Sequence, residues 1–165
     1  MIDVSSDGHA LAVCIRSAFS DVFRPPLDVS IKRSHWEVED IAAMLARLEA
    51  LDATQILASD IENFRNSLSA FTPKGLAFVL PQFMLYAIKN PSSSVTDYTV
   101  YRLFNLKDEN DGPILISLLS SDQKSTICKF LKFISKTIPD RDAMSDEIDG
   151  AIEFWCPAAR RYANG

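Results

Sequence analysis

Thr72-Pro73-Lys74-Gly75-Leu76-Ala77-Phe78-Val79-Leu80-Pro81-Gln82-Phe83-Met84-Leu85-Tyr86-Ala87-Ile88 is the stretch of sequence that decides the fold. Thr72 is a good helix N-cap, and Pro73 fits the first helical position, where its missing N–H costs nothing. The apolar residues that follow cover more than one helical stripe, which predicts a central helix contacted on several sides. Pro81 removes a backbone hydrogen bond and crowds the preceding turn, so we expect the helix to be kinked or broken there.

Outward from this segment, apolar residues recur every three or four positions almost throughout the chain, which predicts helices. We expect them from Ser6 or Asp7 to about Phe19, from Ser34 to about Leu51, from Ser59 to Phe71, from Thr96 through Phe104, over 114–119, from Ser121 to about Ile138, and from about Ala143 to Trp155. Only 27–31 alternates like a strand, and 107–113 has the composition of a polar loop. Short links between helices indicate an all-α, compact multi-helix globular domain that spans residues 1–165, with a loose tail at 159–165.

The composition excludes several classes of protein. Hydrophobic residues make up 47% and charged residues 24% of the 165 positions, which is typical of a globular protein. A formal net charge of −5 argues against a nucleic-acid binder, which needs a basic face. No apolar run approaches the roughly 18–20 residues of a membrane span, and the N-terminus lacks the features of a signal peptide.

The cysteines predict a reducing environment. Cys14, Cys128 and Cys156 are odd in number and far apart, which is not the pattern of a disulfide framework. No CxxC pair suggests zinc or redox chemistry. We therefore expect the protein in the cytoplasm.

Motifs that would fix a chemistry are not found in the sequence. His9 and His35 have no metal-ligand spacing, and neither is placed with a cysteine for nucleophilic catalysis. The five glycines form no GxGxxG or GxxxxGK[ST] loop for phosphate. The sequence therefore predicts no catalytic residue, no cofactor and no metal site.

The strongest local charge imbalance lies near the C-terminus. Asp142, Asp146, Asp149 and Glu153 are spaced by four, three and four residues, which predicts four carboxylates along one helix face. This face is either solvated or a docking face for a basic partner; a metal site is the weaker interpretation, because the EF-hand spacing is missing. A ladder of lysines, at positions 129, 132 and 136, is another solvated face, a nucleic-acid patch or a partner for these acids.

A further candidate is the set of aromatic residues in the middle of the chain. It consists of Phe78, Phe83, Tyr86, Tyr98, Tyr101 and Phe104. These side chains belong either to the core or, where they are exposed, to a hydrophobic contact surface.

The segment 71–85 resembles a family of small, uncharacterised bacterial proteins. Those proteins are built around a Phe/Leu-Thr-Pro-x-Ala/Gly-x-x-Phe/Tyr-x-Leu-Pro-x-Phe/Tyr segment, and Leu119-Ser120-Ser121-Asp122-Gln123 and Phe130-Leu131 match later parts of the same pattern. The resemblance covers about residues 36–135, with departures at Gly75 and in 107–113. It implies a helical fold and a bacterial source, and it supplies no catalytic residue.

Small acidic helical proteins of this kind often resemble immunity proteins, which bind and neutralise a toxin domain. Our first hypothesis is therefore a cytoplasmic binding protein that occludes the active site of a toxin or effector, one with a basic surface such as a nuclease. The candidate docking residues are Asp142, Asp146, Asp149 and Glu153, with Glu37, Glu39 and Asp40 as a second acidic group and Tyr98 or Tyr101 as an aromatic anchor.

Two alternatives remain open. One is a small enzyme that uses carboxylates, with or without a divalent metal, and it requires an inward-facing cluster of acids with raised pKa values. The other is a scaffold module that forms a symmetric homodimer through the central aromatic stretch.

Overall fold

The computed structural model describes residues 4–22, 25–26, 31–32, 47, 56–138 and 141–156. Within these ranges the chain forms seven α-helices and two 3₁₀ helices, and one isolated antiparallel bridge joins Ile31 to Phe71. The prediction of an all-α fold is confirmed. The helices are α1 (Val4–Ala18), α4 (Ala58–Phe64), η3 (Arg65–Ala70), α5 (Pro73–Lys89), α6 (Ser94–Asn105), α7 (Asp111–Leu118), α8 (Ser121–Thr137), η4 (Arg141–Met144) and α9 (Ser145–Trp155).

Helix α5 begins as its sequence predicts. The Thr72 side chain accepts a hydrogen bond from the Gly75 N–H, and Pro73 occupies the first turn. Eleven of the seventeen residues of α5 are buried. The helix continues through Pro81, so of the two outcomes expected there, the break is excluded. We attribute this continuity to packing, because Pro81 itself is buried in the interior that α5 shares with its neighbours.

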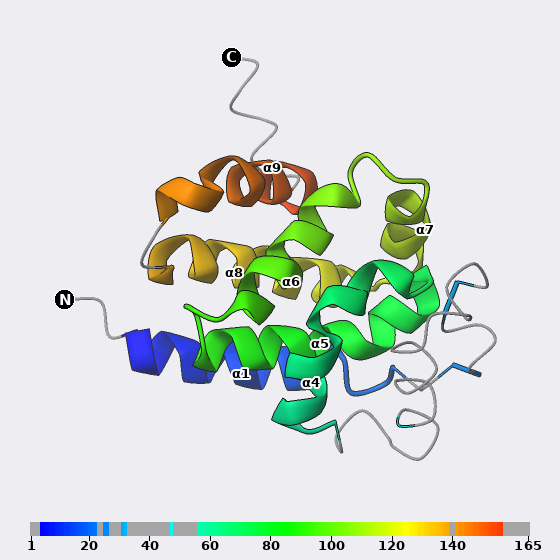
Figure 1. Cartoon of the computed structure of the whole chain (residues 1–165), viewed down its shortest axis with the longest axis horizontal. Helices are drawn as coiled ribbons and strands as arrows, with labels where there is room; N and C mark the ends of the chain where they lie inside the picture. Colours follow the sequence, from blue (N-terminus) through cyan, green and yellow to red (C-terminus); the bar gives the residue numbers. More distant parts are fainter. Residues whose placement is uncertain are drawn as a thin grey trace.

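Five helices contact one another in a closed ring. In order around this ring, α1 packs on α8, α8 on α9, α9 on α6, α6 on α5, and α5 on α1 (Figure 1). Three further elements pack outside the ring. Helices α7 and α4 contact α5, and η3 contacts α6 and α4. The interior of the ring is where apolar side chains from all five helices can meet.

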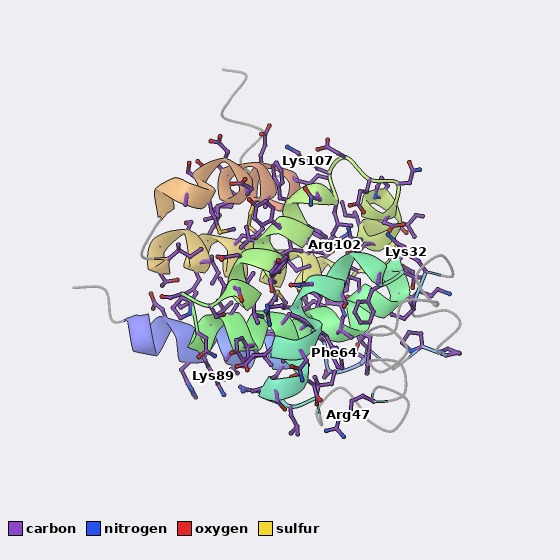
Figure 2. The ribbon with its side chains drawn as sticks, in the orientation of Figure 1. Lys32, Arg47, Phe64, Lys89, Arg102 and Lys107 are labelled. Carbon is purple, nitrogen blue, oxygen red and sulfur yellow. A yellow bond between two sulfur atoms is a disulfide. The ribbon has the colours of Figure 1, made fainter. Side chains whose placement is uncertain are left out.

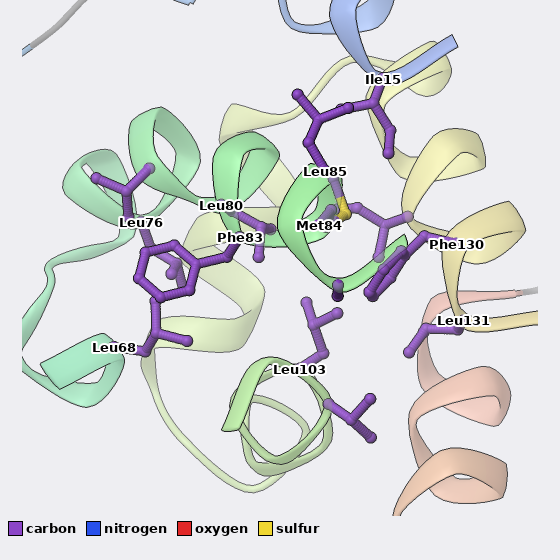
Figure 3. Packing of buried hydrophobic residues seen from close by; sticks show 14 of the residues in the cluster. Ile15, Leu68, Leu76, Leu80, Phe83, Met84, Leu85, Leu103, Phe130 and Leu131 are labelled. Atoms are coloured by element: carbon purple, nitrogen blue, oxygen red, sulfur yellow. The ribbon is translucent and has the colours of Figure 1, made fainter. Parts of the chain in front are cut away.

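The core fills this interior. Ile15 of α1, Met84 of α5, Leu103 of α6 and Phe130 of α8 are fully buried and point toward one another (Figure 3). Ile148 adds the contribution of α9 and is also fully buried. One hydrophobic cluster therefore joins all members of the ring.

Some local predictions need correction. The 107–113 stretch is not wholly a loop, because α7 begins at Asp111 and accommodates Pro113 in its first turn. The helix predicted from Ser59 begins at Ala58, and the Asp60 carboxylate accepts the Leu57 N–H. Apart from Arg47, the helix predicted over 34–51 lies outside the described residues, as does the tail at 159–165.

The prediction of reduced cysteines is wrong for two of the three. Cys128 of α8 and Cys156, directly after α9, form a disulfide, and Cys14 remains a free thiol. The two residues are 28 positions apart in sequence, but the packing of α8 against α9 places their Cα atoms 5.3 Å apart. Spacing alone does not reveal this proximity, because it arises from the tertiary contact of two helices.

This disulfide should contribute measurably to stability. Replacing both Cys128 and Cys156 by serine should lower the free energy of unfolding by about 3.5 kcal/mol, the effect expected for a closed loop of this length. Dithiothreitol should lower the melting temperature of the natural protein and leave that of the double variant unchanged. Cys14→Ser is the matched control and should behave like the natural protein; insensitivity of the natural protein to the reductant would contradict the pairing.

Candidate functional site

A surface pocket lies where η3 meets α6. It has a volume of about 370 Å³. The residues that line this η3–α6 pocket are Arg65, Asn66, Leu68, Ser69, Tyr98, Tyr101, Arg102, Asn105 and Glu109. The α6 members are spaced by three, one and three residues, which places them on one stripe of the helix. The η3 members form two pairs that are three residues apart, 65 with 68 and 66 with 69. Residues three apart lie on the same side of a 3₁₀ helix.

Local capping fixes the start of α6. The Ser93 side chain accepts a hydrogen bond from the Thr96 N–H, and the buried Thr96 hydroxyl donates to the Asn90 carbonyl at 2.8 Å. One turn later the buried Thr99 hydroxyl donates to the Val95 carbonyl at 2.7 Å. Because Thr96 and Thr99 lie on the buried side of α6, Tyr98 and Tyr101 lie on its exposed side.

Both tyrosines are exposed. Tyr98 and Tyr101 each have 41% of their surface accessible, and they are among the few large apolar side chains that are exposed in the described part of the chain. By contrast, Phe78 and Phe83 are buried, and Tyr86 and Phe104 pack partly against the core. The aromatic stretch therefore divides into core residues and a pair at the pocket.

Tyr101 connects the pocket to α9. The negative charge of Glu147 on α9 raises the pKa of the Tyr101 hydroxyl; partial desolvation, a hydrogen bond to Glu147 and the charge of Asp97 add to this effect. Burial raises the pKa of Asp97 itself. Tyr101 on α6 therefore adjoins Glu147 on α9.

A buried arginine forms the inner end of the pocket. Arg102 is only 4% exposed, and its Nη1 donates to Glu109 Oε2 at 2.6 Å (Figure 2). Its Nη2 lies 3.5 Å from Asp111 Oδ2, and Asp111 also pairs with Lys32 at 2.7 Å. The positive charges of Arg102 and Lys32 balance the negative charges of Glu109 and Asp111. Within the described part of the chain, Nε and Nη2 of Arg102 have no hydrogen-bond acceptor.

The acids reach Arg102 because the chain turns tightly after α6. Gly112 makes this approach feasible, since a Cβ at that position would lie 1.9 Å from the Leu106 carbonyl oxygen. The Gly112 N–H also donates to the Glu109 carbonyl. A glycine at the start of α7 thus brings Glu109 and Asp111 back over α6.

The predicted acidic face is only partly assembled. Asp146, Asp149 and Glu153 are exposed on α9. Asp142 lies in η4, before α9 begins at Ser145, so the four acids do not share one α-helix as expected. Glu147, which the spacing did not select, is the acid next to Tyr101. Glu37, Glu39 and Asp40 lie outside the described residues.

The pocket contains groups suited to recognition. Its polar lining consists of guanidinium, amide and hydroxyl groups with a single carboxylate, that of Glu109. Among the described residues, no group of three or more histidine, cysteine, aspartate or glutamate side chains is arranged to hold a metal ion. Asp60 is the one acid that is buried among the described residues, and its carboxylate pairs with Arg47 at 3.0 Å.

The comparison with family models identifies the family. A model described as a family of unknown function, DUF6714, matches residues 8–159. The chain belongs to this family. The DUF6714 match includes every residue of the η3–α6 pocket and the whole of α9. No curated protein and no solved structure matches the chain.

No helix in the described ranges has the length and apolar character that crossing a bilayer requires.

The Arg102 network gives a direct test of the site's electrostatics. Glu109→Gln should lower the free energy of unfolding by about 2 kcal/mol, less than for a fully buried pair because the Glu109 side chain is 37% exposed. Arg102→Met should lower it by less than about 1 kcal/mol, because it removes the buried charge together with its unpartnered N–H groups. Denaturant unfolding measures both. The reverse order would show that the ion pairs of Arg102 stabilise the fold more than an apolar side chain of similar length does.

Proposed function

We propose that this chain is a protein-binding inhibitor, specifically a bacterial immunity protein that neutralises a cognate toxin by covering its active site. The observation that carries the proposal is the pair Tyr98 and Tyr101. They are exposed one turn apart on a rigid helix, at the rim of a pocket lined by Arg65 and Asn66. Tyrosine and arginine are the side chains that contribute most energy at protein interfaces.

The acids of α9 supply the second element. Glu147 lies next to Tyr101, and Asp146 and Glu153 are exposed on the same helix, so α9 brings negative charge to this part of the surface. Such charges accelerate association with a basic partner more than they slow its dissociation. A toxin domain with a cationic active site, such as a nuclease, has the complementary chemistry.

The step from binding protein to immunity protein rests on association. It is supported by the net charge of −5 and the resemblance of the central segment to small bacterial proteins. Fold and size alone do not assign a function. The two alternatives lack comparable support: the η3–α6 pocket has one carboxylate, and Phe78 and Phe83 are committed to the core.

The disulfide changes the location that we propose. Cytoplasmic reductants keep thiols reduced, whereas disulfides persist in oxidising compartments. We therefore assign the cytoplasm only to a form in which Cys128 and Cys156 are thiols. With the bond formed, the protein belongs in an oxidising compartment.

The tyrosines provide the first test. The partner to use is the product of the neighbouring gene, isolated by co-expression and pull-down. Tyr98→Ala and Tyr101→Ala should each weaken the complex about thirtyfold, which corresponds to roughly 2 kcal/mol for an interfacial hot spot. Titration calorimetry measures the dissociation constants.

Val13→Ala is the matched control for the tyrosines. Val13 is a 52% exposed apolar residue on α1, which does not neighbour α6 in the ring. Its replacement should leave the affinity unchanged. Tyrosine variants that remain folded and bind the partner with full affinity would exclude this surface as the interface.

The acids provide a second, independent test. Asp146→Lys combined with Glu153→Lys should slow association with the partner about tenfold at low salt and flatten the dependence of the rate on salt. The dissociation rate should change little. Stopped-flow mixing at several salt concentrations gives both rates.

Asp7→Lys serves as the control for charge reversal, because Asp7 is exposed on α1. It should alter the association rate far less than the α9 changes. An α9 variant that associates as fast as the natural protein, with the same dependence on salt, would exclude the role of the acidic face and leave the tyrosine test unaffected.

A further inference from the structure

A second, larger pocket lies where α7 and α8 meet the end of α9. It has a volume of about 610 Å³. The residues that line this α8–α9 pocket are Ile116, Ser121, Lys124, Ser125, Cys128, Lys132, Phe154, Trp155 and Cys156. The α8 members are spaced by three, one, three and four residues, so they occupy one face of the helix. The volume is within the range of sites that hold small molecules.

Much of the lining is apolar. It includes Ile116 of α7, the Phe154 and Trp155 rings, and the Cys128–Cys156 disulfide. The Trp155 indole N–H donates to the Leu103 carbonyl at 3.0 Å, so its polar atom is already satisfied on the side of α6. These residues therefore provide only apolar surface to a ligand in the pocket.

The polar lining is cationic. Lys124 and Lys132 are on the same face of α8, and neither takes part in a salt bridge with the described residues. Ser121 and Ser125 add hydroxyl groups. Ser121 is also the first residue of α8, where the helix dipole favours an anion. No acidic side chain lines the pocket.

We propose that the α8–α9 pocket binds a small amphiphile with a single anionic head group, such as a carboxylate. The apolar body of the ligand packs against Ile116, Phe154 and Trp155. The head group pairs with Lys124 at the start of α8, and Lys132 adds positive charge along the same face. This combination of an apolar cavity with a few charged groups at its edge is the arrangement by which proteins orient such ligands. The inference is independent of the proposed function, because none of these residues lines the η3–α6 pocket.

Dodecanoate is a suitable probe, titrated into the full chain below its micellar concentration. We expect saturable binding at a ratio of one to one by calorimetry, with a change in tryptophan fluorescence because Trp155 lines the pocket. Dodecanol has the same apolar chain without the charge and should bind at least tenfold more weakly.

Three variants locate the site. Lys124→Glu combined with Lys132→Glu should weaken dodecanoate binding at least tenfold. Lys129→Glu makes the same kind of charge change on an exposed position of α8 outside the lining, and it should leave the affinity within twofold. Ser125→Trp should block binding of both ligands by filling the cavity, and the circular dichroism spectrum of each variant confirms that it is folded.

Several results would overturn the proposal. They are the absence of saturable dodecanoate binding, equal affinity for dodecanol, or the same loss of affinity in Lys129→Glu as in the double lysine variant. Binding that persists in a folded Ser125→Trp variant would place the ligand elsewhere.

Discussion

The burial of α5 is the interaction on which the rest of the structure depends. Its apolar residues surround the helix axis, so no single neighbouring helix is able to cover them. The chain meets this requirement by placing α1, α4, α6 and α7 around α5. Helices α8 and α9 then close the ring between α1 and α6, and the disulfide joins these two closing helices covalently. Every surface feature described above is attached to a helix that is held in place by this arrangement.

The parts of the fold that sequence reasoning predicts well are those with local causes. Thr72 and Pro73 start α5, and Ser120 with Gln123 forms a capping box at the start of α8, within a residue of the predicted boundary. Arg102 illustrates where this reasoning fails. Its helix has an amphipathic sequence pattern, in which an arginine is expected on the exposed face. Arg102 is buried instead, because the tight turn after α6 places Glu109 and Asp111 next to its guanidinium group. The disulfide has the same kind of cause, since only the packing of α8 on α9 brings its cysteines together.

The candidate site shows the same division. The sequence selects Tyr98 and Tyr101 by residue type, as members of the aromatic stretch. It does not select Glu147, because the choice among the acids of α9 depends on how that helix is turned against α6. Two contacts set this orientation: Gly150 allows Phe104 to approach closely, and the Trp155 indole reaches the Leu103 carbonyl. Both are tertiary contacts, which the spacing of carboxylates does not encode.

The same contacts support the proposal that the tyrosine surface belongs to an inhibitor. The turn of α6 that follows Tyr101 is held from two directions, by the ion pair of Arg102 with Glu109 and by the hydrogen bond from Trp155 to Leu103. A side chain that is presented by a fixed helix loses little further freedom when a partner binds. More of the contact energy then remains available for affinity, since the loss of conformational entropy on association is small. Because the packing of the ring has already ordered this surface, an inhibitor built on it is able to cover a toxin without rearranging its own backbone.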